Sequence, residues 1–312
     1  MQTLPGKRIA LLSATLVLSA CGGGGGGTAP TPAPTPLATT AFTKWSAVQP
    51  GVTYKADGLG QEVTGTASGG QFVAITPSGV ADGYSAYLTF DSPPELSRLA
   101  LTTPASTLVV LDKAAAGTTF ADVTLSPETS AQFVGARNST SVAVMAKAIE
   151  LGWDYQTFGI WETGRDSPTT RKFGAMSVGN TVDTAIPTTG TATFTGYATG
   201  SYVNAAGAGT TVFADLTVGA DFGNRSLTFN TSNTQTSSNW VDFASNSGLD
   251  LNGTLTYAAG TNRFTGSVAS DGGLTGNSTG QFYGPNAEEL GGVFLLQGSG
   301  VETYAGAYGA KQ

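Results

Sequence analysis

Residues 212–224 read VFADLTVGADFGN, and this stretch decides the fold. Apolar and polar side chains alternate along it, with Val212, Ala214, Leu216, Val218, Ala220 and Phe222 set against Asp215, Thr217 and Asp221. A period of two residues is typical of a β-strand with one buried face. Gly223-Asn224 then predicts a tight turn, and Leu227 and Phe229 resume the alternation. We therefore expect residues 211–234 to form one long hairpin.

Similar strand patterns recur through the C-terminal half of the chain. They predict strands at residues 153–162, 190–203, 211–222, 225–234, 249–258, 263–270, 278–284, 292–298 and 303–310. The short connections favour antiparallel neighbours, and about eight such strands close into a small barrel without exposed edges. Phe194, Phe264 and Tyr304 each precede a glycine by two positions, a spacing that lets a strand bend while a ring covers its backbone. The expected fold is all-β, with an eight-stranded antiparallel β-barrel at residues 150–312.

Residues 42–149 show a less regular pattern. Alternating apolar side chains at residues 84–90 predict a strand that the Pro-Pro pair at 93–94 ends. Residues 108–111 predict another strand, while the alanine-rich residues 142–150 fit a helix or a strand. We expect a smaller, mainly-β domain here, preceding the barrel.

The N-terminus has the organisation of an export signal. Lys7 and Arg8 precede an apolar run from Ile9 to Ala20, which is too short to span a bilayer but suits a signal-peptide core. The run ends in Leu18-Ser19-Ala20-Cys21, which resembles the bacterial lipobox, where the cysteine receives a diacylglycerol. We expect residues 1–20 to be a lipoprotein signal peptide and Cys21 to be lipidated, the alternative being a plain secreted leader. Gly22 stands where an inner-membrane retention aspartate is often found, which favours the outer membrane.

Residues 21–41 have the composition of a tether. Uninterrupted glycine from Gly22 to Gly27 is flexible, and the alternating prolines that follow form an extended spacer. Acyl chains contribute about 0.8 kcal/mol per buried methylene, so the lipid alone is expected to hold the protein at the membrane.

Composition excludes several classes of function. The chain has 14 basic and 21 acidic residues and a net charge of −7, and removal of Lys7 and Arg8 makes the remainder more acidic. This charge disfavours nucleic-acid binding. The absence of histidine excludes Ser-His triads and His-ligated zinc, and the sole cysteine is expected to carry lipid. We therefore expect neither an enzyme nor a metal or cofactor site.

The C-terminal segment points to a family. Residues 280–294, GQFYGPNAEELGGVF, resemble the signature of the transferrin-binding protein B β-barrel domain. Residues 155–161 resemble its first strand, and residues 221–227 resemble one of its hairpins. Asn286 is expected to cap a single turn through Leu290, so we assign this signature to the fold and not to ligand contact. Residues 42–149 resemble, more weakly, the handle domain of that family.

The resemblance implies a lipid-anchored protein of the bacterial outer membrane, exported to the cell surface by a translocon. Relatives capture host transferrin, haemoglobin, haem or complement factor H, and a TonB-dependent receptor is an implied partner. The chain holds one handle-barrel pair, as single-lobed relatives do. The expected ligand is therefore a host protein, transferrin-like or other, or a small solute. Haem could be ligated here only by a tyrosine, Met145 or Met176.

Two other functions compete with capture and uptake, namely a structural or adhesive surface lipoprotein and a transmembrane barrel. A lipid anchor and a long tether argue against the transmembrane barrel. Trp153, Trp161, Trp240 and the loop at residues 203–209 are candidates for a recognition surface, although single aromatics more often fill an interior. Trp240 is our tentative partner contact, because it is the one large aromatic in the polar loop 235–248.

The anchor is directly testable. Replacing Cys21 with Ala should abolish metabolic labelling with a palmitate analogue, because the acyl acceptor is gone. The variant should appear as an unprocessed precursor or a soluble protein. Labelling equal to that of the parent chain would contradict the lipoprotein assignment.

Overall fold

The computed structural model describes residues 38–104 and 107–312, so the signal peptide, Cys21 and the tether up to residue 37 lie outside the described residues. The protein is all-β, with 61% of the described residues in strands, as the alternation predicted. Residues Leu37–Gln312 form one compact unit that contains two sheets. Within the described part, no helix has the length and apolar character needed to cross a membrane.

The first sheet contains eleven strands among the described residues, and the main path runs β6-β5-β4-β2-β11-β10-β9-β8-β7. Its strands are β1 (Thr40–Ala41), β2 (Thr53–Ser68), β3 (Gln71–Pro77), β4 (Ala81–Ser92), β5 (Glu95–Thr102), β6 (Thr107–Asp112), β7 (Thr119–Val123), β8 (Phe133–Arg137), β9 (Ser141–Ala146), β10 (Gln156–Thr163) and β11 (Thr170–Gly179). A 3-10 helix, η1 (Trp45–Ala47), precedes β2. The alanine-rich segment after residue 141 is thus a strand, which settles the open choice between helix and strand.

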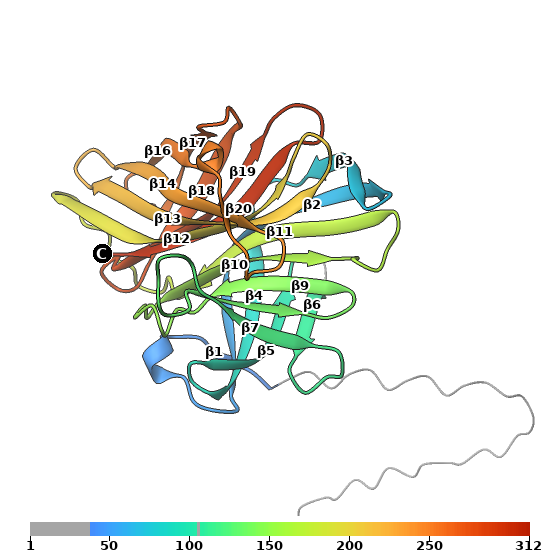
Figure 1. The fold of residues 1–312 in the computed structure, drawn as a ribbon. Helices are drawn as coiled ribbons and strands as arrows, with labels where there is room; N and C mark the ends of the chain where they lie inside the picture. The colour runs from blue at the N-terminus through green and yellow to red at the C-terminus, as the bar shows by residue number, and fades with distance from the viewer. Residues whose placement is uncertain (1–37, 105–106) are drawn as a thin grey trace, which may run out of the picture. The chain divides into compact units, whose positions relative to one another are not determined.

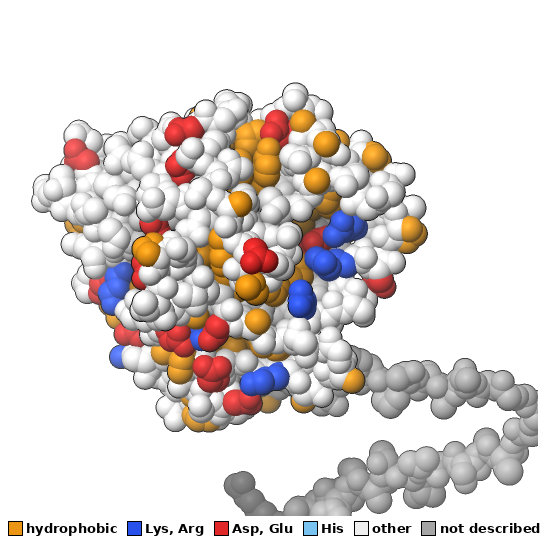
Figure 2. Space-filling view, in the orientation of Figure 1, with side chains coloured by type: hydrophobic (Ala, Val, Ile, Leu, Met, Phe, Trp, Pro, Cys, Tyr) orange, Lys and Arg blue, Asp and Glu red, His pale blue; other side chains and the backbone are white. Residues whose placement is uncertain are grey.

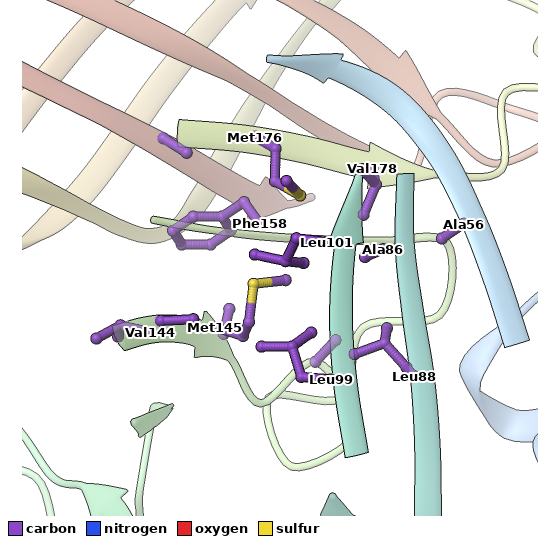
Figure 3. Packing of buried hydrophobic residues seen from close by; sticks show 14 of the residues in the cluster. Ala56, Ala86, Leu88, Leu99, Leu101, Val144, Met145, Phe158, Met176 and Val178 are labelled. Carbon is purple, nitrogen blue, oxygen red and sulfur yellow. The ribbon is translucent and has the colours of Figure 1, made fainter. Parts of the chain in front are cut away.

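This sheet curls around its own hydrophobic core. Apolar side chains from β2, β4, β5, β9, β10 and β11 meet there, including Leu88, Leu101 and Phe158 (Figure 3). Met145 and Met176, the only methionines considered as haem ligands, are 2% and 0% exposed in this core. Both side chains therefore serve packing.

The second sheet closes into an eight-stranded antiparallel barrel, coloured yellow to red in Figure 1. Its strands are β12 (Thr191–Val203), β13 (Gly209–Asp221), β14 (Ser226–Ser237), β16 (Leu251–Tyr257), β17 (Arg263–Ser270), β18 (Thr275–Tyr283), β19 (Glu289–Gln297) and β20 (Thr303–Lys311). The short β15 (Ala244–Ser245) adds to β14, and a 3-10 helix, η2 (Ser247–Leu249), leads into β16. The expected hairpin is confirmed, since β13 and β14 pair from Thr211↔Ser237 to Asp221↔Ser226.

Aromatic rings fill the barrel and cover the backbone of glycines. Each ring covers a glycine on the neighbouring strand, not the glycine two positions later on its own strand. A Cβ atom on Gly280 would lie 2.4 Å from the Phe264 ring, and one on Gly306 would lie 2.3 Å from the Phe294 ring. In both pairs the ring and the glycine are register partners on neighbouring strands. The aromatic residues thus compensate glycines on adjacent strands, which allows the tight curvature of a small barrel.

Two expectations about the chain path are wrong. The strand expected at 153–162 as part of the barrel forms β10, which pairs with β9 and β11 in the first sheet. The chain therefore passes between sheets at residues 180–190, beyond the predicted boundary. The turn expected through Leu290 also ends earlier, because Ala287 has a positive φ of 58° and β19 begins at Glu289.

The two sheets pack closely because several of the side chains that β19 and β20 turn toward the first sheet are small. Gly291, Ala305, Ala307 and Gly309 are buried on this face. A Cβ atom on Gly309 would lie 2.3 Å from Nε2 of Gln156 on β10. In Figure 1, β10 and β11 lie between the barrel and the rest of the first sheet. Larger side chains would push the sheets apart.

The buried carboxylate of Glu289, in the barrel, is hydrogen-bonded to the backbone that leads into β10 of the first sheet. Its oxygens accept hydrogen bonds from the backbone N–H groups of Asp154 (2.6 Å), Tyr155 (3.0 Å) and Gln156 (3.1 Å). Burial raises the pKa of Glu289 to about 7, against the opposing effect of these donors and of Lys311. The carboxyl group is 0% exposed.

The raised pKa predicts a pH-dependent stability. Between the ordinary carboxyl pKa and about pH 7, Glu289 is protonated in the folded state but ionised in the unfolded state. The stabilisation that comes from this bound proton is complete below about pH 4.5 and is lost as the pH rises through 7. The free energy of unfolding should fall by at most about 3 kcal/mol between pH 5 and pH 8. Chemical denaturation across this range measures it, and the absence of histidine limits competing titrations.

Replacing Glu289 with Gln is the control. The amide should lower stability at every pH, because its NH2 group cannot accept from the backbone donors. The slope between pH 5 and pH 8 should become flatter. An unchanged slope would show that Glu289 is not the titrating group.

Candidate functional site

A solvent-open cleft of about 310 Å3 lies where the first sheet meets the barrel loops. Its walls come from the β2–β3 hairpin, from β9 to β11, from the loop between β12 and β13, and from the loop after β14. In the corresponding region of Figure 2, Lys and Arg side chains gather beside exposed hydrophobic ones. No single segment forms this cleft, so its chemistry depends on the tertiary structure.

The β10–β11 hairpin supplies a charged cluster. Glu162 pairs in register with Phe173, so Arg171, two residues away, lies diagonally opposite on the same face. The Glu162 carboxylate forms an ion pair with Arg171 and also lies 3.2 Å from Nη1 of Arg165. The Arg171 guanidinium lies 5.1 Å from the ring centroid of Phe72, on β3, at a distance suited to a cation–π contact.

Trp161 forms a buried part of the same wall. Its side chain is 1% exposed, and the ring packs so closely on Gly174 that a Cβ atom there would lie 2.7 Å from it. Among the described residues, neither the indole N–H of Trp161 nor the Nε–H of Arg171 has a hydrogen-bond partner. Buried donors are normally satisfied, so these two groups are exceptions within the wall of the cleft.

Trp240 reaches the cleft from the loop after β14. Its backbone has a positive φ of 66°, and its N–H donates to Oγ of Ser237 at 2.8 Å. Asn239 accepts from the N–H groups of Val241 and Asp242, which makes the loop an ordered turn. The loop thus holds Trp240 inward while Val241 is 76% exposed.

The Trp240 ring lies against the first sheet. A Cβ atom on Gly135, in β8, would lie 2.4 Å from the indole, and the guanidinium of Arg137 lies 5.7 Å from the ring centroid. The indole N–H donates to Oγ1 of Thr211 at 3.4 Å. Trp240 is therefore half-buried against the first sheet, although its loop is polar in sequence.

Other sequence-based candidates divide between cleft and core. Trp161, Trp240 and residues 203, 208 and 209 of the predicted loop all line the cleft. Trp153 does not, because it is 5% exposed and stacks on Phe158 with centroids 5.9 Å apart. Sequence reasoning missed Arg137, Arg165 and Arg171, since they lie on separate strands or loops with no shared motif.

A second recess, of about 300 Å3, lies beside the turn after β16. Thr184, Phe222, Arg225 and Tyr257 are among its lining residues. The hydroxyls of Thr184 and Tyr257 have no hydrogen-bond partner among the described residues. It has fewer charged groups than the first cleft, which is the stronger candidate site.

Residues 186–312 match the family model for the C-lobe and N-lobe beta barrels of Tf-binding protein B, which confirms the resemblance drawn from the C-terminal segment. No curated protein sequence matches the chain. A solved transferrin-binding protein B mutant from Haemophilus parasuis is 12% identical, with a TM-score of 0.40, over 84% of this chain and 77% of that chain. A solved surface lipoprotein is 14% identical, with a TM-score of 0.43, over 80% of this chain and 98% of that chain.

Isotype 1 transferrin-binding protein B from serogroup B Neisseria meningitidis is a further solved structure. It is 17% identical, with a TM-score of 0.39, over 74% of this chain. The match covers 52% of that chain, so this protein spans about half its length.

The contact between Trp240 and Gly135 predicts coupled mutations. Replacing Trp240 with Ala should lower the free energy of unfolding by about 2 kcal/mol, less than for a fully buried tryptophan. Replacing Gly135 with Ala should also destabilise, because the new methyl group overlaps the indole. Chemical denaturation of the single and double variants measures both effects.

The double variant provides the decisive comparison. Once the indole is absent, the Gly135 substitution should lose most of its effect, giving a coupling of about 1 kcal/mol or more. Additive effects would show that the ring does not lie on Gly135.

Proposed function

Because residues 186–312 match the family model for the beta barrels of Tf-binding protein B, we propose that this protein is a binding protein that captures a host protein at the bacterial surface. The family match is the observation that carries the proposal. The barrel interior is occupied by large rings, including Phe229, Phe264 and Tyr308. This packing supports recognition by loops and favours a macromolecular partner over a solute enclosed in the barrel.

The loop after β14 is the proposed contact. Val241 is an exposed hydrophobic side chain at its tip, and Trp240 beneath it fixes the loop against the first sheet. A rigid loop loses little conformational entropy on binding, which favours affinity. Trp240 thus remains a proposed partner contact, and it also holds the loop in place.

The location and partners follow from the same proposal. Lipidation of Cys21 would anchor the protein in the outer membrane, and a surface-lipoprotein translocon would deliver it to the outer face. Transferrin is the first partner to test, because it is the ligand in the family name. Delivery of iron or another nutrient to a TonB-dependent receptor is the proposed consequence of capture.

A matched pair of exposed valines tests the proposal. The chain from residue 37 onward is immobilised and exposed to transferrin and then to whole serum. We expect one serum protein to be retained, and Val241→Asp to weaken its capture about tenfold by placing a charge in an apolar contact. Val182 is 70% exposed on the connection between β11 and β12, outside the cleft, so Val182→Asp should leave capture unchanged.

Neither substitution should shift the thermal midpoint, since both side chains face solvent. Equal loss in the two variants would contradict the assignment of the contact to this loop. If neither transferrin nor any other serum protein is retained, the proposed capture of a host protein fails.

A further inference from the structure

The cleft is positively charged in an acidic protein. Arg137, Arg165 and Arg171 line it together with one acidic residue, Glu162, so three guanidinium groups face one carboxylate. The whole chain has a net charge of −7. A local excess of arginine in a recess attracts anions and concentrates them there.

The arginines come from three places that folding brings together. Arg137 ends β8, Arg165 lies in the turn after β10, and Arg171 lies near the start of β11. Glu162 contacts only the second and third of these, leaving Arg137 without a carboxylate among the ion pairs of the described residues. A guanidinium presents planar donors that match a carboxylate, so this arrangement suits a small acid.

Two buried donors lie in the wall beside these arginines. The indole N–H of Trp161 and the Nε–H of Arg171 have no acceptor among the described residues, although both atoms are buried in cleft-lining side chains. A buried donor without an acceptor is unfavourable.

The remaining walls are apolar and aromatic. Phe72, Phe173, Tyr202 and Trp240 line the cleft, and two of these rings already contact guanidinium groups. A recess of about 310 Å3 lies at the lower end of the range for small-molecule sites. The cleft therefore combines an arginine-lined end, which suits an anion, with aromatic walls that suit a compact apolar group.

We propose that this cleft binds a small organic acid, with its carboxylate at the arginines and its planar apolar body against Trp240 and Phe72. The inference goes beyond the capture of a host protein, because the ligand is small and binding needs no macromolecular partner. Glu162 acts as an internal competitor, since its carboxylate already engages Arg165 and Arg171. Ligand affinity is set by the balance between this internal acid and the incoming one.

Calorimetry with matched probes tests the proposal on the chain from residue 37 onward. At low salt, 2-naphthoate should bind with one-to-one stoichiometry, and the neutral 2-naphthamide should bind at least about tenfold more weakly. Arg137→Gln and Arg165→Gln should each weaken 2-naphthoate binding about five- to tenfold. Glu162→Gln should strengthen it severalfold, because the competing charge is removed.

Arg98→Gln is the control for lost positive charge, because Arg98 lies on β5, pairs with Asp112 and does not line the cleft. It should leave the affinity unchanged, and circular dichroism should show all variants folded. Equal binding of acid and amide, or equal weakening by Arg98→Gln, would overturn the proposal. So would the absence of binding for benzoate, 2-naphthoate and indole-3-acetate up to about 10 mM.

Discussion

The junction between the two sheets depends on the buried carboxylate of Glu289, which accepts hydrogen bonds from the three backbone N–H groups of residues 154–156. These residues lead into β10, a strand of the first sheet, while Glu289 begins β19 of the barrel. A hydrogen bond to a charged group is stronger than a neutral one, but a buried charge is costly unless it is fully paired. Burial raises the pKa of Glu289 to about 7, so the junction between the sheets is sensitive to pH near neutrality.

The small residues of β19 and β20 make this junction possible. Because Gly291 and Gly309 carry no side chain, β10 and β11 approach the barrel wall closely enough for Ser177 Oγ to hydrogen-bond Tyr283 Oη at 2.9 Å. The same approach sets the position of the far ends of β10 and β11. Those ends carry Glu162 and Arg171, so the packing at one end of the hairpin determines the cleft at the other.

Trp240 links the cleft to the barrel. Its positive φ is an uncommon conformation for a bulky residue, and strained backbone of this kind persists only where its surroundings enforce it. Here Ser237 and Asn239 hold the loop, and Gly135 leaves room for the ring. The sequence identified Trp240 as a candidate because it is the one large aromatic in a polar loop. Its half-buried position depends on Gly135 in the first sheet, which leaves room for the indole.

The sequence by itself determined which side chains face inward along the β13–β14 hairpin of the barrel. Val212, Leu216 and Val218 lie in the barrel core as their alternation predicted, and the turn at Gly223-Asn224 connects the expected hairpin. Only the tertiary structure decided to which sheet β10 belongs, placing it beside β9 and not in the barrel. The physical reason is that alternation reports burial of a face, whereas the ladder is built from backbone groups common to all residues. Arg137, Arg165 and Arg171 lie close together for the same reason. Strand pairing brings them to one cleft, and no local sequence pattern predicts that pairing.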